Sequence, residues 1–207
     1  MKLQVESNHF YKNYDTKERF CSYWHQIEEI VLQNPASILE IGIGNGFVSR
    51  HLRQRGFNVV TLDIDKKLNP DLTASVLNTP FFNGAFEVVA CYEVLEHLPY
   101  KYLEVALLEI YRISSSHVLL SLPDANPVYR AYIQVPKLGS FKKLIQIPRM
   151  KKPVHHFDGQ HYWEIGKTGY SLNSIINVIQ KVGFKIEKTY RVFEMPYHRF
   201  FILNRLK

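Results

Sequence analysis

Residues Ile38 to Leu52 read I-L-E-I-G-I-G-N-G-F-V-S-R-H-L. A short apolar run is followed by glycines at alternate positions, Gly42, Gly44 and Gly46, and then by a helical pattern that ends at Gly56. This order predicts a strand, a tight glycine turn and a helix. Glycines permit such a turn and the close approach of a ligand, because no Cβ atom intrudes. The helix that follows directs its unpaired N–H groups toward the same place.

The glycine loop differs from two common nucleotide-binding loops. The dinucleotide fingerprint G-x-G-x-x-G/A needs a small third residue for close helix–strand packing, and this chain has Phe47 there. The phosphate-loop pattern G-x-x-x-x-G-K-[ST] is absent. A tight turn between packed elements, without a ligand, remains the alternative for this stretch taken alone.

An acidic residue follows the next predicted strand. Residues 57–62 form an apolar run that ends in Asp63-Ile64-Asp65. The interval from Gly42 to Asp63 is about the twenty residues at which an acid meets a ribose in nucleotide sites. Asp63 is favoured over Asp65 because it directly follows the apolar run, and a solvated acid at a strand end is the alternative.

Two segments together resemble a known family. The pattern E-x-G-x-G-x-G runs from Glu40 to Gly46, and residues 77–99 read L-N-T-P-F-F-N-G-A-F-E-V-V-A-C-Y-E-V-L-E-H-L-P. Both are similar to class I S-adenosylmethionine (SAM)-dependent methyltransferases. The resemblance implies an α/β, Rossmann-like fold with a seven-stranded, mostly parallel sheet, the last strand antiparallel and helices on both faces. It also implies SAM as cofactor and S-adenosylhomocysteine as product.

The resemblance further implies a set of cofactor-binding residues. Ser75 stands where many members carry an acid, so a backbone N–H of Val76 is the alternative contact to adenine. The whole set is Glu40, Gly42, Gly44, Asn45, Gly46, Asp63, Ile64, Ser75, Val76, Cys91 and Tyr92.

A general base is harder to choose, because only some acceptors need one: a hydroxyl or a protonated nitrogen must lose a proton, whereas a carbon acceptor or a neutral amine can attack without a base. Glu93 and His156 are the candidates, and Tyr92, His155 and His161 stay open. The run E-V-L-E-H ends in Glu96 and His97, but no third ligand stands nearby in the sequence. We therefore expect no metal site and a structural role for His97.

The remaining chain suggests one methyltransferase domain over residues 1–207. Residues 1–36 hold a predicted helix, 16–32, which is expected to cover the sheet and to lid the cofactor with Tyr11, Tyr14 or Tyr23. Residues 37–122 form the predicted SAM-binding core, and residues 171–207 a helix followed by a strand hairpin. Residues 123–170 form a basic and aromatic insertion near the expected acceptor.

Within this insertion, residues 136–153 carry only positive charges. The bases are Lys137, Lys142, Lys143, Arg149, Lys151 and Lys152. Such a field favours an anionic acceptor, RNA or an anionic lipid surface. A solvated positive face on a lid is the equally weighted alternative.

Composition limits the class of protein. The chain has 207 residues, a net charge of +7 and 46% hydrophobic residues, which is ordinary globular usage. Its two cysteines, Cys21 and Cys91, form no C-x-x-C pair, and no signal peptide or spanning segment is visible, so a cytoplasmic protein is expected. The predicted function is methyl transfer from SAM to an unidentified, small, anionic acceptor. The alternative is a non-catalytic SAM- or nucleic-acid-binding protein on the same fold, and the oligomeric state is not predicted.

Overall fold

A computed structural model of the chain describes residues 10, 14–149 and 151–206. Its centre is a seven-stranded sheet with the order β3-β2-β1-β4-β5-β9-β8. β1 pairs in parallel with both β2 and β4, so the strand order reverses at β1 and β4. β9, the last strand in the chain, runs antiparallel between β5 and β8, which confirms the predicted sheet. The strands are β1 (Ile38–Ile41), β2 (Val59–Asp63), β3 (Leu72–Thr73), β4 (Phe86–Tyr92), β5 (Ser114–Pro123), β8 (Phe184–Arg191) and β9 (His198–Arg205).

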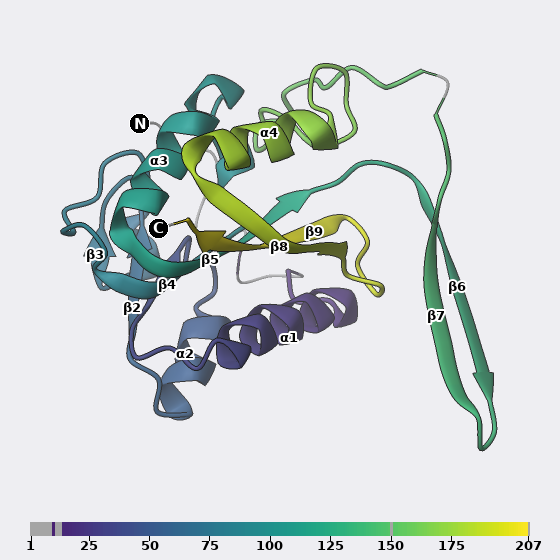
Figure 1. Cartoon of the computed structure of the whole chain (residues 1–207), viewed down its shortest axis with the longest axis horizontal. Coiled ribbons are helices and arrows are strands. Elements are labelled where there is room, and N and C mark those ends of the chain that lie inside the picture. Colours follow the sequence, from purple (N-terminus) through teal and green to yellow (C-terminus); the bar gives the residue numbers. More distant parts are fainter. Residues whose placement is uncertain (1–9, 11–13, 150, 207) are drawn as a thin grey trace.

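Two helices cover each face of the sheet (Figure 1). α1 (Lys17–Leu32) and α2 (Phe47–Gln54) lie on one face, and α3 (Leu103–Ile113) and α4 (Leu172–Val182) lie on the other. Because both faces are covered, β1 is buried along its whole length and β4 at every residue but Glu87. The connection between β2 and β3 is too short for an α-helix and holds one 3₁₀ turn, Lys66–Leu68.

Local sequence accounts for the helix ends. The Thr16 side chain accepts a hydrogen bond from the Arg19 N–H at the start of α1, and the Ser171 side chain accepts one from the Ser174 N–H at the start of α4. Gly183 ends α4 in the left-handed conformation, with φ of 110°.

Phe47 contacts α1. Its ring stacks on Tyr23 with centroids 5.1 Å apart and meets the edge of Phe20 at 5.2 Å. The bulky residue that departs from the dinucleotide fingerprint thus packs α2 against the N-terminal helix, which covers the sheet as predicted.

The basic insertion contains two strands that the sequence did not predict. β6 (Val128–Val135) and β7 (Gly139–Gln146) form an antiparallel pair that is separate from the main sheet. This hairpin projects from the body of the molecule (Figure 1).

Candidate functional site

A cavity of about 440 Å³ opens where β1, β2 and β4 end. The carboxyl ends of parallel strands at a reversal of strand order are the usual ligand position in such sheets. The first turns of α1 lie against the cavity, contributing Arg19, Tyr23 and Gln26. The predicted lid residues Tyr14 and Tyr23 line it, whereas Tyr11 lies outside the described residues.

The structure brings most of the predicted site residues together. Gly46 and Cys91 are not among the lining residues: Gly46 caps the start of α2, and Cys91 is 1% exposed in the core. Glu93 lines the cavity, but His156 is exposed and does not. The predicted cofactor residues that line the cavity are Glu40, Gly42, Gly44, Asn45, Asp63, Ile64, Ser75, Val76 and Tyr92.

The glycine loop needs glycine for two different reasons. At Gly42, with φ of 82°, a Cβ atom would collide with Cγ2 of Val94. At Gly44, with φ of 53°, a Cβ atom would meet only the ring of Phe10, at 3.7 Å, so the backbone conformation is the constraint there. Close packing therefore excludes a side chain at Gly42, and the turn itself favours glycine at Gly44.

Asp63 lies across the end of β1 and is held by backbone groups. One carboxylate oxygen accepts the N–H of Ile43 at 2.9 Å, and the other accepts the N–H of Asp65 at 2.8 Å. Burial raises the pKa of Asp63, although these two hydrogen bonds act to lower it. Each carboxylate oxygen keeps acceptor capacity for a ligand in the cavity, because one oxygen can accept more than one hydrogen bond.

Glu40 presents a buried carboxyl group beside the glycine loop. It is 4% exposed, and its Oε2 has no hydrogen-bond partner among the residues that the structure describes. Burial raises the pKa of Glu40 to about 8. An unpartnered buried oxygen is costly, so this position suits a ligand that donates a hydrogen bond or carries a positive charge.

Asn45 ties the loop to the start of α1. Its amide nitrogen lies 2.9 Å from Oδ1 of Asp15 and 3.2 Å from the Tyr23 hydroxyl, which itself donates to Asp15. The side-chain oxygen of Asn45 accepts the N–H of Phe47 at 2.9 Å. Asn45 thus links the start of α1 to the first turn of α2.

Ser75, Val76 and Tyr92 complete this end of the cavity. The Ser75 hydroxyl accepts the N–H of Leu77 at 3.2 Å. The Tyr92 hydroxyl donates to the carbonyl of Gln26 at 3.3 Å, and burial raises the pKa of Tyr92. Tyr92 is therefore engaged with α1, which does not favour it as a base.

Histidine and tyrosine side chains line the other end of the cavity. They come from three distant segments. His97 follows β4, and His161 lies in the insertion. Tyr197 directly precedes β9, and His198 is its first residue. Sequence reasoning missed Tyr197 and His198 because no motif surrounds them. Only the antiparallel pairing of β9 with β5 carries them to the ends of the parallel strands.

Glu93 and His198 form a close pair in this part of the cavity. Nε2 of His198 lies 3.7 Å from Oε2 of Glu93, and its Nδ1 lies 2.7 Å from the hydroxyl of Ser22. Burial lowers the pKa of His198, although the carboxylate of Glu93 acts to raise it. Glu93 has a left-handed backbone, with φ of 53°, a conformation that non-glycine residues rarely adopt outside functional sites and turns.

No described helix is long and apolar enough to cross a membrane.

Comparisons with known proteins identify the family of the chain. Residues 13–189 match the methyltransferase domain family. The chain is 28% identical over 125 residues to ribosomal RNA small subunit methyltransferase A of Mesomycoplasma hyopneumoniae, over 57% of this chain and 48% of that protein. The chain thus spans about half the length of this curated relative.

Solved structures share the fold at low sequence identity. A 1,6-didemethyltoxoflavin-N1-methyltransferase of Burkholderia thailandensis, with bound S-adenosylhomocysteine, matches with a TM-score of 0.65 and 12% identity, over 97% of this chain and 85% of that one. Magnesium protoporphyrin IX methyltransferase of Synechocystis, also with that product bound, matches with a TM-score of 0.63 and 15% identity, over 96% and 92% of the two chains. Since the family match spans most of the sequence, this chain belongs to the methyltransferase domain family, with the class I fold that its sequence predicted.

Proposed function

We propose that this protein is a SAM-dependent methyltransferase that acts on a small-molecule acceptor. The observation that carries the proposal is the cavity at the strand ends, which joins the glycine loop, Glu40 and Asp63 to a separate cluster of ionisable side chains. The solved relatives with S-adenosylhomocysteine bound support the choice of cofactor.

The residues present fit this cofactor. Glu40 offers a buried carboxylate oxygen that has no partner among the described residues, which suits the ammonium group of SAM. Asp63 offers acceptors for the ribose hydroxyls, and the backbone of Val76 is the proposed contact to adenine. Gly44 lets the backbone approach the ligand without an intervening side chain.

When bound, SAM supplies an electrophilic methyl group on a sulfonium and departs as a neutral thioether, so no acid is needed for the leaving group. The chain must then exclude water and align the acceptor. α1 closes over the cavity with Tyr23 and Gln26. Glu93 and the neutral His198 are our candidates to accept a proton from the acceptor, since they face the cavity 3.7 Å apart.

Calorimetry tests the cofactor assignment. Purified wild-type protein is expected to bind SAM and S-adenosylhomocysteine in one-to-one stoichiometry. Gly44→Val is expected to abolish this binding, because valine resists a φ of 53° and its side chain would enter the cavity. Equal affinity of the folded variant and wild type would contradict the site. Cofactor binding without methyl transfer to any compound in a broad acceptor screen would favour the non-catalytic alternative.

We also propose that the β6–β7 hairpin docks on an anionic lipid surface. The strand register places five large apolar side chains on one face of the hairpin, and Leu138 at its tip is 85% exposed. These are Tyr129, Ile133, Val135, Phe141 and Ile145, each more than 40% exposed, and Lys143 lies among them on the same face. Exposed apolar surface of this extent marks a partner or a membrane.

Charge favours lipid as the partner. No acidic residue lies between Asp124 and Asp158 in the sequence, and Lys137 and Lys143 are exposed on the hairpin. Basic residues beside an inserted apolar face are attracted to anionic lipids. RNA, on which the mycoplasmal relative acts by its name, would be recognised through base stacking and phosphate contacts. Tyr129 and Phe141 could stack on bases, but Ile133, Val135, Ile145 and the tip residue Leu138 are aliphatic, and their exposure is better explained by insertion into a lipid surface.

Vesicle sedimentation tests the docking. Wild type is expected to bind vesicles of equimolar phosphatidylcholine and phosphatidylglycerol, and to bind pure phosphatidylcholine far less. A double variant, Leu138→Ser with Phe141→Ser, is expected to lose this binding, whereas Phe82→Ser, which removes a 75% exposed ring elsewhere, keeps it. Failure to bind either vesicle, with salt-sensitive binding of a single-stranded RNA, would point to RNA instead.

A further inference from the structure

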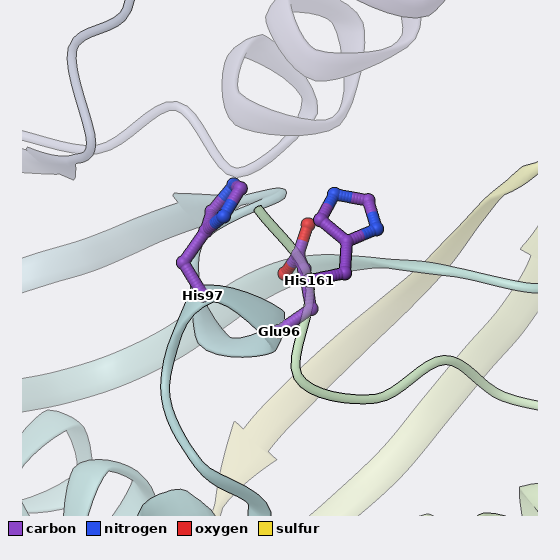
Figure 2. Close-up of side chains that lie close together, drawn as sticks. All are labelled: Glu96, His97 and His161. Carbon is purple, nitrogen blue, oxygen red and sulfur yellow. The ribbon is translucent and has the colours of Figure 1, made fainter. Parts of the chain in front are cut away.

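The acceptor end of the cavity holds a cluster that the sequence pattern alone did not complete. Glu96 and His97 follow β4, and the fold brings His161 of the insertion beside them (Figure 2). Each residue offers one ligand atom, and the three atoms lie within 4.8 Å of one another. The third ligand that is missing near the E-V-L-E-H run is therefore supplied by a segment more than sixty residues away.

Glu96 is the strongest indication that something binds there. Its side chain is fully buried, at 0% exposure, and neither carboxylate oxygen has a hydrogen-bond partner among the described residues. Figure 2 shows the carboxylate lying between the two imidazole rings. A buried carboxylate without a partner costs several kcal/mol unless a cation or donor compensates it.

The hydrogen bonds of the two histidines suit metal ligation. Nδ1 of His97 lies 3.0 Å from the carbonyl oxygen of Gln160, which can only accept, so the lone pair of the neutral ring is on Nε2. Nδ1 of His161 lies 3.2 Å from Glu164, whose carboxylate also accepts the Tyr197 hydroxyl at 2.6 Å. Ligating histidines commonly donate their other N–H to a carbonyl or carboxylate, which fixes the ring.

A competing trio shares His161 but is already satisfied. Asp158 accepts the backbone N–H groups of Gln160 and His161, each at 2.9 Å. Glu164 accepts the hydroxyl of Tyr197 at 2.6 Å and lies 3.6 Å from the ammonium of Lys167. Only the trio with Glu96 contains an uncompensated charge-bearing group.

We propose that Glu96, His97 and His161 bind a divalent first-row transition-metal ion such as Zn²⁺. Two imidazoles and one carboxylate suit such ions better than Mg²⁺ or Ca²⁺, which prefer oxygen ligands. With metal–ligand bonds of about 2.1 Å, the ligand atoms need to lie within about 4.2 Å, so small side-chain rotations complete the site.

The ion would face the acceptor. His97 and His161 line the cavity, and three protein ligands leave coordination positions open toward it. A hydroxyl oxygen of the acceptor would take one of them, and coordination would favour loss of its proton. This consequence rests on the proposed methyltransferase function, whereas metal binding itself does not.

Metal binding is measured on full-length protein that has been treated with a chelator and dialysed. We expect one Co²⁺ or Zn²⁺ per chain by calorimetry and metal analysis, a visible Co²⁺ absorption spectrum that Zn²⁺ displaces, and far weaker binding of Mg²⁺. Glu96→Gln, which keeps the shape of the side chain, and His161→Ala are each expected to weaken Co²⁺ binding at least about tenfold.

Two matched variants serve as controls. His156→Ala removes an exposed histidine of the same segment, and Asp158→Asn removes the charge of the competing trio, so both are expected to keep wild-type Co²⁺ affinity. SAM affinity and the unfolding midpoint are measured on every sample, and His97→Gln replaces any variant that fails to fold.

Absence of stoichiometric Co²⁺ binding by wild type would overturn the inference. So would wild-type affinity in folded Glu96→Gln and His161→Ala, or a loss confined to Asp158→Asn. Normal SAM binding in those samples would leave the proposed function standing, and absent SAM binding with intact Co²⁺ binding would leave the metal site standing.

Discussion

At the residue scale, the cofactor end of the cavity depends on two carboxyl groups with different surroundings. Asp63 is stabilised by two backbone N–H groups, whereas one oxygen of Glu40 finds no partner in the part of the chain that the structure describes. The surroundings of Asp63 favour a charged carboxylate that accepts further hydrogen bonds. The surroundings of Glu40 favour binding of a cation or a hydrogen-bond donor. Substitutions at the two positions should therefore produce different effects.

Asp63→Ala is expected to weaken binding of SAM and S-adenosylhomocysteine alike by about 1.5–3 kcal/mol, the usual contribution of a hydrogen bond to a charged group. The effect should be equal for both ligands because the ribose is common to them. Calorimetry provides the measurement, and Asp65→Ala is the matched control, since Asp65 caps the following turn through the Lys67 N–H. Unchanged affinity in Asp63→Ala with a loss in Asp65→Ala would move the ribose contact to Asp65.

Glu40→Gln is expected to alter how stability depends on pH. The pKa of Glu40 is about 8 in the folded protein against an ordinary 4.5, so between these values the folded state holds a proton that the unfolded state has released. Stability from this group is therefore greatest below pH 4.5 and falls as the pH rises through about 8.

Urea unfolding without cofactor, over a pH series, makes this visible. The free energy of unfolding of wild type should fall more steeply between pH 4.5 and 8 than that of Glu40→Gln, and the variant should be the more stable protein above pH 8. All other titratable groups, Glu96 included, are the same in both proteins, so the difference between the two curves isolates Glu40. Parallel curves would mean that Glu40 has no raised pKa.

The sequence located the cavity-lining residues near the glycine loop better than those of the histidine and tyrosine cluster, for a physical reason. Asp63 follows its strand at a fixed distance from the glycine loop, so local spacing locates it. His161 and His198 reach the cavity through a long insertion and an antiparallel strand, and no local pattern encodes those contacts. The expectation of no metal site likewise considered only residues close to Glu96 and His97 in the sequence. It could not include His161, which is close to them only in the folded chain.

At the element scale, the N-terminal helix is coupled to the glycine loop through one side chain. Asn45 contacts Asp15 and Tyr23 on the α1 side and accepts the N–H of Phe47, the first residue of α2. Hydrophobic periodicity predicted the positions of strands and helices. It could not predict the hydrogen bonds of Asn45 to Asp15 and Tyr23, because these depend on how α1 packs. The β6–β7 strands escaped prediction because their apolar residues are exposed, so their alternation does not mark a face of the core.

Asn45→Ala is expected to destabilise the protein by about 1–2 kcal/mol, because it removes the hydrogen bond from the Phe47 N–H and those to Asp15 and Tyr23, and each hydrogen bond usually contributes about 1 kcal/mol. It should also weaken SAM binding, since α1 would cover the cavity less firmly. Chemical unfolding and calorimetry measure the two effects. Asn173→Ala, at an exposed position of α4, is the control and should change neither quantity by more than about 0.5 kcal/mol. Wild-type stability in Asn45→Ala would show that α1 is held by its apolar face alone.

At the scale of the whole molecule, the hairpin is an appendage on a complete domain. β6 and β7 pair only with each other, while the seven-stranded sheet is covered by its own four helices. Two polar contacts join the hairpin to the loop before β9: Lys142 with the Glu194 carboxylate at 2.7 Å and Arg130 with the Glu194 carbonyl at 2.9 Å. Because the first of these is a half-exposed ion pair, it contributes at most about 1 kcal/mol.

Excision of the hairpin is therefore expected to leave a folded protein that binds SAM. Val128 and Gln146 face each other across the strand pair, so their backbones lie about 5 Å apart and two glycines suffice to join them. The shortened protein should keep wild-type SAM affinity and lose no more than about 1 kcal/mol of stability, and it should no longer bind anionic vesicles. Unfolding, calorimetry and vesicle sedimentation on the same preparation separate these effects. An excised protein that fails to fold would contradict the independence of the domain, and one that still binds anionic vesicles would remove the hairpin from the docking surface without affecting the cofactor site.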